Sequence, residues 1–222
     1  MKLKPGSEEW FNLRWGKLTA SNIGKIMPMK RGGYYAAREN LLIELQNQKM
    51  NVRRDNSIKS FRSEATDWGT FYEPYARRAY ELKTGDAVET MDPIPHPTLK
   101  GLSATPDGKL ILENKLIEIK CPKTSKHDVL IQLNIAGVPK TDTRWIDQIN
   151  SDYQWQMLCQ AACTGATEVD FVQYDPRVEE AQQLMIIPFP IDPERMALMM
   201  EEAEKFINEL NERVNKRRSM NG

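Results

Sequence analysis

The stretch from Ser103 to Pro122, SATPDGKLILENKLIEIKCP, decides the fold of this chain. Within it, Pro106-Asp107-Gly108 has the composition of a tight turn, because proline presets φ and glycine accepts a positive φ. Two apolar runs follow, Lys109 to Leu112 and Leu116 to Lys120, and the polar residues Glu113 to Lys115 separate them. Two short strand-like runs joined by a polar turn predict a β-hairpin.

The second run of this hairpin places charged side chains together. Side chains alternate between the two faces of a strand, so Glu118 and Lys120 should share one face while Ile117 and Ile119 point to the other. Asp107 lies in the turn that precedes the hairpin. The pattern therefore predicts a cluster of two carboxylates and an ammonium group, although an exposed hairpin with a charged outer face would have the same sequence.

This cluster is typical of metal-assisted phosphodiester cleavage. Carboxylates are the hard oxygen ligands that Mg²⁺ prefers, and Mg²⁺ also takes phosphate oxygens from a substrate. Lys120 would lie beside the attacking water or the scissile phosphate and would stabilise the developing negative charge. The spacing Asp-x10-Glu-x-Lys is short and common, so the rest of the chain has to support the hypothesis.

Length and periodicity indicate one α/β domain. The 222 residues are enough for a sizeable core. We expect a single nuclease domain over residues 1–222, with a basic N-terminal region (1–63), a catalytic core (64–190) and a C-terminal helix (192–217). Apolar spacing predicts further helices over residues 34–48, 64–82 and 142–164, and strands over 168–174 and 183–189. Pro74 should kink or restart its helix, because proline lacks the N–H that would bond Thr70.

Charge is unevenly distributed along a chain whose net charge is zero. Residues 1–63 contain 13 Lys and Arg against 5 Asp and Glu, whereas the remainder contains 18 against 26. The basic region could follow a phosphate backbone while the acidic remainder holds a metal ion, and an uneven surface composition would give the same counts.

Some classes of function are poorly supported. No stretch approaches 18 consecutive apolar residues, and the first residues lack the apolar core of a signal peptide, so we expect a soluble, intracellular protein. The absence of a Gly-rich phosphate-binding motif argues against an ATP-driven enzyme. The chain has only two histidines, His96 and His127, so a mechanism that depends on histidine has little support.

The order of motifs resembles the phage lambda exonuclease family of viral recombinases (YqaJ-like), within the PD-(D/E)xK nuclease superfamily. The matching pieces span residues 10 to 177: Trp10 with Leu13-Arg14 and Gly16, Leu18 to Ser21, Trp68-Gly69 with Tyr72-Glu73, Ser103 with Pro106 to Gly108, Glu118 to Pro122 with Thr124-Ser125, Gln154-x-Gln156, and Tyr174 to Arg177. The resemblance implies an α/β, restriction-endonuclease-like core with a mixed central β-sheet flanked by helices.

The resemblance also implies a metal site. Asp107, Glu118 and the backbone carbonyl of Ile119 would bind one or two Mg²⁺ ions, for which Mn²⁺ could substitute. Glu73 would be a third carboxylate near the metal. Gln154, the first glutamine of Gln-x-Gln, would lie at the active site, where its amide could hydrogen-bond the attacking water or a metal ligand; an exposed helical glutamine would look the same in the sequence.

A second site concerns the end of the substrate. Backbone N–H groups and the Ser21 hydroxyl at a helix start can form an anion site, to which Arg14 could add a bidentate contact. In the family that the chain resembles, the equivalents of Arg14 and Ser21, together with an arginine matching Arg31, hold a 5′-terminal phosphate. Lys30 could serve instead of Arg31, and ordinary helix capping by Ser21 is the alternative for that residue.

The implied function is digestion of duplex DNA with 5′-phosphorylated ends, from 5′ to 3′, which releases mononucleotides and leaves 3′ single-stranded overhangs for phage-type recombination. The resemblance implies a ring-shaped homotrimer, a single-strand annealing protein as partner, a cytoplasmic location in a bacterial host, and no membrane association. Two alternatives stay open: an endonuclease of the same fold, structure-specific or restriction-type, and a non-catalytic DNA-binding recombination accessory. Asp107 and Glu118 weigh against the accessory, because two buried carboxylates are costly to ionise without a metal.

Overall fold

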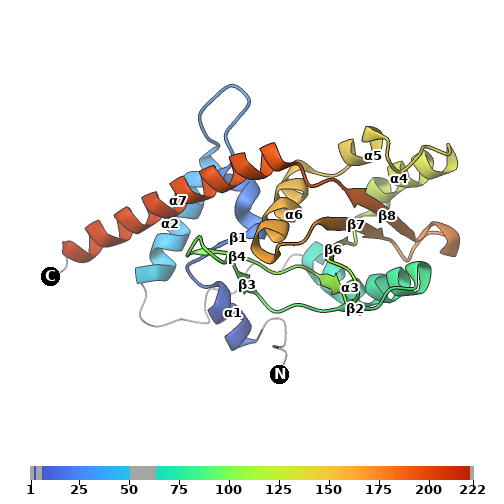
Figure 1. Ribbon diagram of the computed structural model, residues 1–222, viewed down its shortest axis with the longest axis horizontal. Coiled ribbons are helices and arrows are strands. Elements are labelled where there is room, and N and C mark those ends of the chain that lie inside the picture. The colour runs from blue at the N-terminus through green and yellow to red at the C-terminus, as the bar shows by residue number, and fades with distance from the viewer. Residues whose placement is uncertain (1–2, 4–6, 51–63, 221–222) are drawn as a thin grey trace.

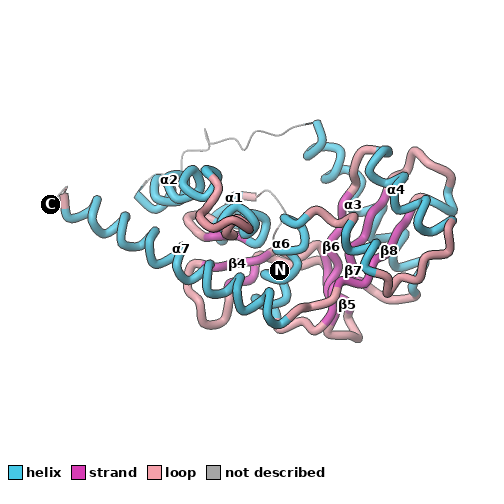
Figure 2. Tube along the Cα trace, turned by 90° about the horizontal axis from the view of Figure 1, so that it is seen from above, coloured by secondary structure: helices cyan, strands magenta, loops and turns pink. Residues whose placement is uncertain are grey.

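The computed structural model describes residue 3 and residues 7–50 and 64–220. Two β-sheets form its centre, and helices cover them (Figure 1). The five-stranded sheet lies toward one end of the molecule, and the helices α2 (Ala36–Met50) and α7 (Pro193–Ser219) extend toward the other (Figure 2). In the described ranges, no helix is both long enough and apolar enough to span a bilayer.

The larger sheet has the strand order β2-β5-β6-β7-β8. Its strands are β2 (Val88–Glu89), β5 (Gly108–Leu110), β6 (Lys115–Lys120), β7 (Glu168–Tyr174) and β8 (Leu184–Phe189). β6 and β7 are parallel, and the other neighbours are antiparallel. The predicted hairpin and the mixed central sheet are therefore confirmed.

The parallel pair requires a long connection, since parallel neighbours cannot be joined by a tight turn. Between β6 and β7 run α4 (Thr124–Ile135), α5 (Thr143–Asp147) and α6 (Ser151–Thr164), and Gly165 ends α6 in the left-handed conformation at φ 73°. The predicted single helix over 142–164 is wrong: it is broken between α5 and α6, where the Asn150 side chain accepts from the Asp152 N–H and starts a new helix. An Asn before a helix satisfies an N–H that has no partner within the helix.

The smaller sheet consists of β1 (Leu18–Thr19), β3 (Ile94–Pro95) and β4 (Leu102–Ala104), in the order β1-β4-β3. The chain enters this sheet from α1 (Glu8–Arg14), whose N-cap Ser7 accepts a hydrogen bond from the Trp10 N–H. The residues after β1 form the 3₁₀ helix η1 (Ala20–Ile26), which packs against α6. The expected helix start is therefore present, but the helix is a 3₁₀ helix. Its N-cap is Thr19, whose side chain makes no capping bond, and not Ser21.

Two hydrophobic cores lie on opposite faces of the larger sheet. Leu116 and Phe171 belong to the core that α6, α2 and α7 cover, whereas Ile117 and Val172 face α3 (Glu64–Thr84). The strand alternation that the sequence predicts is therefore used to bury both faces. α3 does not restart at Pro74, because its buried residues after the proline, Ala76 among them, hold the helix on the sheet.

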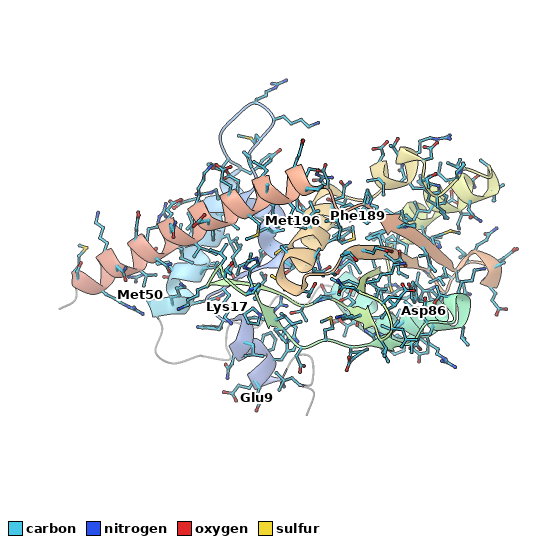
Figure 3. All side chains as sticks on the ribbon, in the orientation of Figure 1. Glu9, Lys17, Met50, Asp86, Phe189 and Met196 are labelled. Atoms are coloured by element: carbon cyan, nitrogen blue, oxygen red, sulfur yellow. The ribbon has the colours of Figure 1, made fainter. Side chains whose placement is uncertain are left out.

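The C-terminal helix is close to its predicted extent. Asp192 caps α7 through the N–H groups of Glu194 and Arg195, as expected for Asp-Pro-Glu. Phe189 at the end of β8 and Met196 near the start of α7 mark where the chain passes from the sheet to this helix (Figure 3). A second 3₁₀ turn, η2 (Glu180–Gln182), precedes β8.

Candidate active site

The β5–β6 hairpin brings together the charged residues that the sequence singles out. Asp107 lies just before β5, and its Oδ2 accepts a hydrogen bond of 2.7 Å from the Ile119 N–H on β6. Gly108 does not have the positive φ that the turn predicts. A Cβ at this position would collide with Val88 and Ile117, so glycine is needed for the close approach of the strands.

Glu118 is fully buried beneath α6, where its carboxylate accepts hydrogen bonds at both oxygens. Oε1 accepts from Gln156 Nε2 at 2.7 Å and pairs with Lys120 Nζ at 2.5 Å. Oε2 accepts from Gln160 Nε2 at 2.6 Å. A carboxylate buried in this way requires such donors, because an unpaired buried charge is strongly destabilising.

The surroundings shift the pKa values of both Asp107 and Lys120. Burial, and then the charge of Glu118, raise the pKa of the Asp107 carboxyl well above its usual value. Burial lowers the pKa of Lys120, but the carboxylates of Glu118 and Asp107 more than offset this and raise it. Lys120 is therefore a cation at neutral pH, and its Nζ lies 4.6 Å from the centre of the Tyr153 ring.

Two cavities meet beside Asp107 and Glu73, whereas Glu118 is fully buried and borders neither. The larger, of about 980 Å³, is bordered by Lys120, Tyr153 and Gln173, among others. The smaller, of about 490 Å³, contains Arg14, Ser21 and Thr105. Glu73 and Asp107 border both cavities. A chain molecule such as a nucleic-acid strand could therefore extend from one cavity into the other past Asp107.

The smaller cavity holds a guanidinium group among hydroxyls. Arg14 donates to Thr105 Oγ1 at 2.7 Å and to Ser21 Oγ at 3.5 Å, and it lies 4.4 Å from the Trp10 ring centre. No carboxylate of the described residues forms a salt bridge with Arg14, and burial lowers its pKa. Sequence reasoning missed Thr105, although it lies only two residues before Asp107. An arginine surrounded by hydroxyls can bind a phosphate group.

Glu73 lies beside the metal-site candidates but has a partner of its own. Its Oε1 accepts from Arg77, and the same guanidinium nitrogen donates to the Asp107 carbonyl at 2.9 Å. Arg77 was not identified from the sequence, and it links α3 to the backbone just before β5. The charge of Glu73 contributes to the raised pKa of Asp107, which places the third predicted carboxylate in the same electrostatic neighbourhood.

The structure does not bring all predicted residues to this centre. The amide of Gln154 is bonded elsewhere: Nε2 donates to the carbonyls of Ile146 and Ile149, and Oε1 accepts from Arg195 at 2.9 Å. Gln154 still borders the larger cavity. The glutamines that contact Glu118 are instead Gln156 and Gln160, which lie one helical turn apart on α6.

Lys30 and Arg31 are exposed in the loop between η1 and α2. In Figure 1 this loop projects from the upper side of the molecule, whereas α1, which ends at Arg14, lies on the lower side. Neither cation borders the smaller cavity, which Arg14 and Ser21 line, so within one chain they are not gathered with those two residues.

The donors around Asp107 fit a hard divalent cation. Asp107 and Glu118 are close enough that one charge perturbs the other, and a cation between them would relieve that repulsion. Ile119 borders the larger cavity, and its side chain packs in the core beneath α3, so its backbone carbonyl is the group it could offer to a cation. In the described ranges no three Asp, Glu, His or Cys side chains gather as a metal site. The remaining ligands would therefore be the carbonyl, water and substrate oxygens.

Comparison with solved structures identifies the fold. An alkaline exonuclease, LHK-Exo, from Laribacter hongkongensis is 34% identical, and the match covers 97% of this chain and 99% of that chain with a TM-score of 0.77. Its complex with dAMP matches with the same values. A phage-related exonuclease from Haemophilus somnus 129PT is 14% identical over 91% of this chain and 98% of that chain, with a TM-score of 0.62, and shows the fold alone. The predicted restriction-endonuclease-like α/β core is confirmed.

The family is shown by sequence as well. No functionally curated protein matches the chain. The family model of the YqaJ-like viral recombinase domain matches residues 9–167, which contain the hairpin, Arg14 and the glutamines of α6. Because this model matches most of its length, the chain belongs to the family of YqaJ-like viral recombinase domains.

Proposed function

We propose that this chain is a metal-dependent exonuclease that degrades duplex DNA from 5′ to 3′, releases 5′-mononucleotides and leaves 3′ single-stranded overhangs. The observation that carries the proposal is the junction of the two cavities at Asp107. A terminal phosphate held by Arg14 in the smaller cavity leaves the next phosphodiester of the same strand to lie toward Asp107. The exonuclease relative at 34% identity supports the class of reaction, and its complex with dAMP shows that a mononucleotide binds that protein.

In this proposal, Asp107, Glu118 and the Ile119 carbonyl hold one or two Mg²⁺ ions, with Mn²⁺ able to substitute and Glu73 nearby. When bound, the metal supplies Lewis acidity to the phosphate and a more acidic water. Lys120 is a cation rather than a base, since the carboxylates raise its pKa, and it stabilises the negative charge that develops on the phosphate. The amides of Gln156 and Gln160 keep Glu118 oriented.

Membership of the recombinase family supports a wider setting for the reaction. We place the enzyme in phage-type homologous recombination, where its 3′ overhangs are handed to a single-strand annealing protein in the cytoplasm of a bacterial host. A homotrimeric ring around the duplex would keep the enzyme on its substrate. In such a ring, the exposed Lys30 and Arg31 could contact DNA even though they lie away from Arg14 within one chain.

The direct test is digestion of linear duplex DNA labelled at one 5′ or one 3′ end, in Mg²⁺ or in EDTA. Early release of the 5′ label as a mononucleotide, in Mg²⁺ alone, is the expected result. Early release of the 3′ label would contradict the polarity. Cleavage of covalently closed circles would favour an endonuclease of the same fold, and binding without digestion would favour a non-catalytic accessory.

The Arg14 pocket gives a separate prediction. Arg14→Ala should slow digestion of 5′-phosphorylated ends by roughly 10- to 100-fold, because a charge-assisted contact to the terminal phosphate is lost. Digestion of 5′-hydroxyl ends should change little, so the preference for phosphate should disappear. The measurement is the initial rate on the two substrates, with Arg78→Ala, an exposed arginine on α3, as control. Equal loss on both substrates would show that Arg14 only supports the fold.

A further inference from the structure

Gln173 lies next to Lys120 and faces the same way. The two residues are paired in the register of the parallel strands β6 and β7, so their side chains point to one face of the sheet. The pair two residues earlier, on the same face, supports this: Phe171 is registered with Glu118, and its ring stacks on Tyr153, which lies over Lys120. Gln173 also borders the larger cavity. Its carboxamide is therefore placed in the proposed active site.

The carboxamide of Gln173 makes no hydrogen bond to another side chain or backbone group of the described residues. The residue is 7% exposed, and its Oε1 is buried without a hydrogen-bond partner among the described residues. Buried polar groups in folded proteins are nearly always hydrogen-bonded, and one that is not destabilises the fold. Among the described residues no hydrogen bond holds either end of this carboxamide, so it can contact a ligand in the cavity without breaking one.

The other glutamines of the centre are already committed. Gln156 and Gln160 donate to Glu118. Both ends of the Gln154 amide are bonded, Nε2 to the carbonyls of Ile146 and Ile149 and Oε1 to Arg195. Gln154, the residue that the sequence pattern favours for contact with the reacting groups, would have to break three hydrogen bonds to make one. Gln173 would break none that the structure shows in its described part.

We infer that Gln173 is a catalytic residue that donates a hydrogen bond from its carboxamide to a non-bridging oxygen of the phosphodiester held beside Lys120. The inference rests on the proposed nuclease function and deepens it by assigning a second donor to the reacting phosphate. Rotation about the terminal torsion of a glutamine is soft, so the N–H groups can turn toward the cavity without moving the strand. Lys120 then stabilises the negative charge of the phosphate, and the hydrogen bond from Gln173 orients it.

The experiment compares wild type and Gln173→Met in single-turnover cleavage of 5′-phosphorylated duplex DNA. The scissile phosphodiester at the 5′ end has either two non-bridging oxygens or one of them replaced by sulfur, in the Rp or the Sp configuration. Methionine has nearly the same shape as glutamine but no donor. We expect the all-oxygen substrate to be cleaved roughly 10- to 100-fold more slowly by the variant. For one diastereomer, the slowing caused by sulfur should be smaller in the variant than in wild type, because both changes remove the same hydrogen bond.

Gln132→Met is the control, since Gln132 is exposed on α4 outside both cavities, and it should cleave all substrates like wild type. If thermal unfolding shows that Gln173→Met is not folded, Gln173→Asn takes its place, because it keeps the amide but is too short to reach. Slower cleavage with unchanged sulfur effects on both diastereomers would make Gln173 a structural residue and overturn the inference. Wild-type rates in the variant would overturn it as well and leave the proposed function standing. A wild-type chain that cleaves no end in Mg²⁺ would overturn both.

Discussion

Replacement of Lys120 by methionine should lower the rate of DNA hydrolysis by roughly 10³-fold, the cost of losing one preorganised charged donor at a reacting centre. Lys120 is paired with Glu118, and the carboxylates raise its pKa, so it carries its charge throughout the neutral range. Methionine preserves most of the side-chain volume and its contact with Tyr153 while removing the charge. The rate is measured in single turnovers at saturating Mg²⁺ on linear 5′-phosphorylated duplex.

The matched control for this prediction is Lys109→Met on the neighbouring strand β5, which borders neither cavity. It should hydrolyse DNA at the wild-type rate. DNA binding in EDTA should survive Lys120→Met, because the Arg14 pocket is intact. If Lys120→Met kept the wild-type rate, the lysine would serve only to neutralise the buried charge of Glu118.

Replacement of Asp107 by asparagine should abolish hydrolysis, by on the order of 10³-fold or more, and yet stabilise the metal-free fold at neutral pH. Asparagine can still accept the Ile119 N–H but carries no charge. Burial and then Glu118 raise the pKa of the Asp107 carboxyl, so the folded state holds this proton more tightly than the unfolded state. The resulting stabilisation is present below the unfolded pKa and is lost as pH rises through the raised pKa.

Thermal unfolding in EDTA at pH 5 and pH 8 measures this effect. The wild-type Tm should fall between these pH values by more than the Tm of Asp107→Asn. Added Mg²⁺ should raise the wild-type Tm at pH 8 by binding the folded state, and should leave Asp107→Asn nearly unchanged. An equal rise in both proteins would show that the metal binds elsewhere.

The sequence by itself determined the local structure and the family. The hairpin around Asp107 and Glu118 follows from two apolar runs separated by polar residues and from alternation every two residues. The caps at Ser7 and Asp192 follow from side chains that bond an N–H two or three residues ahead. The order of motifs from residues 10 to 177 was enough to identify the YqaJ-like family, because that order does not depend on knowing any contact.

The tertiary structure decided which polar groups serve the carboxylates. The donors to Glu118 are 38 and 42 residues away along the chain, and Thr105 is 91 residues from Arg14. No periodicity within a helix or strand encodes such pairings, since they depend on how α6 and α1 pack against the strands. Packing of the elements also explains why Gln154 and Gln173 differ in their hydrogen bonds. Both are glutamines in the sequence, but packing saturates the first amide and leaves the second, across from Lys120, without a partner in the described structure.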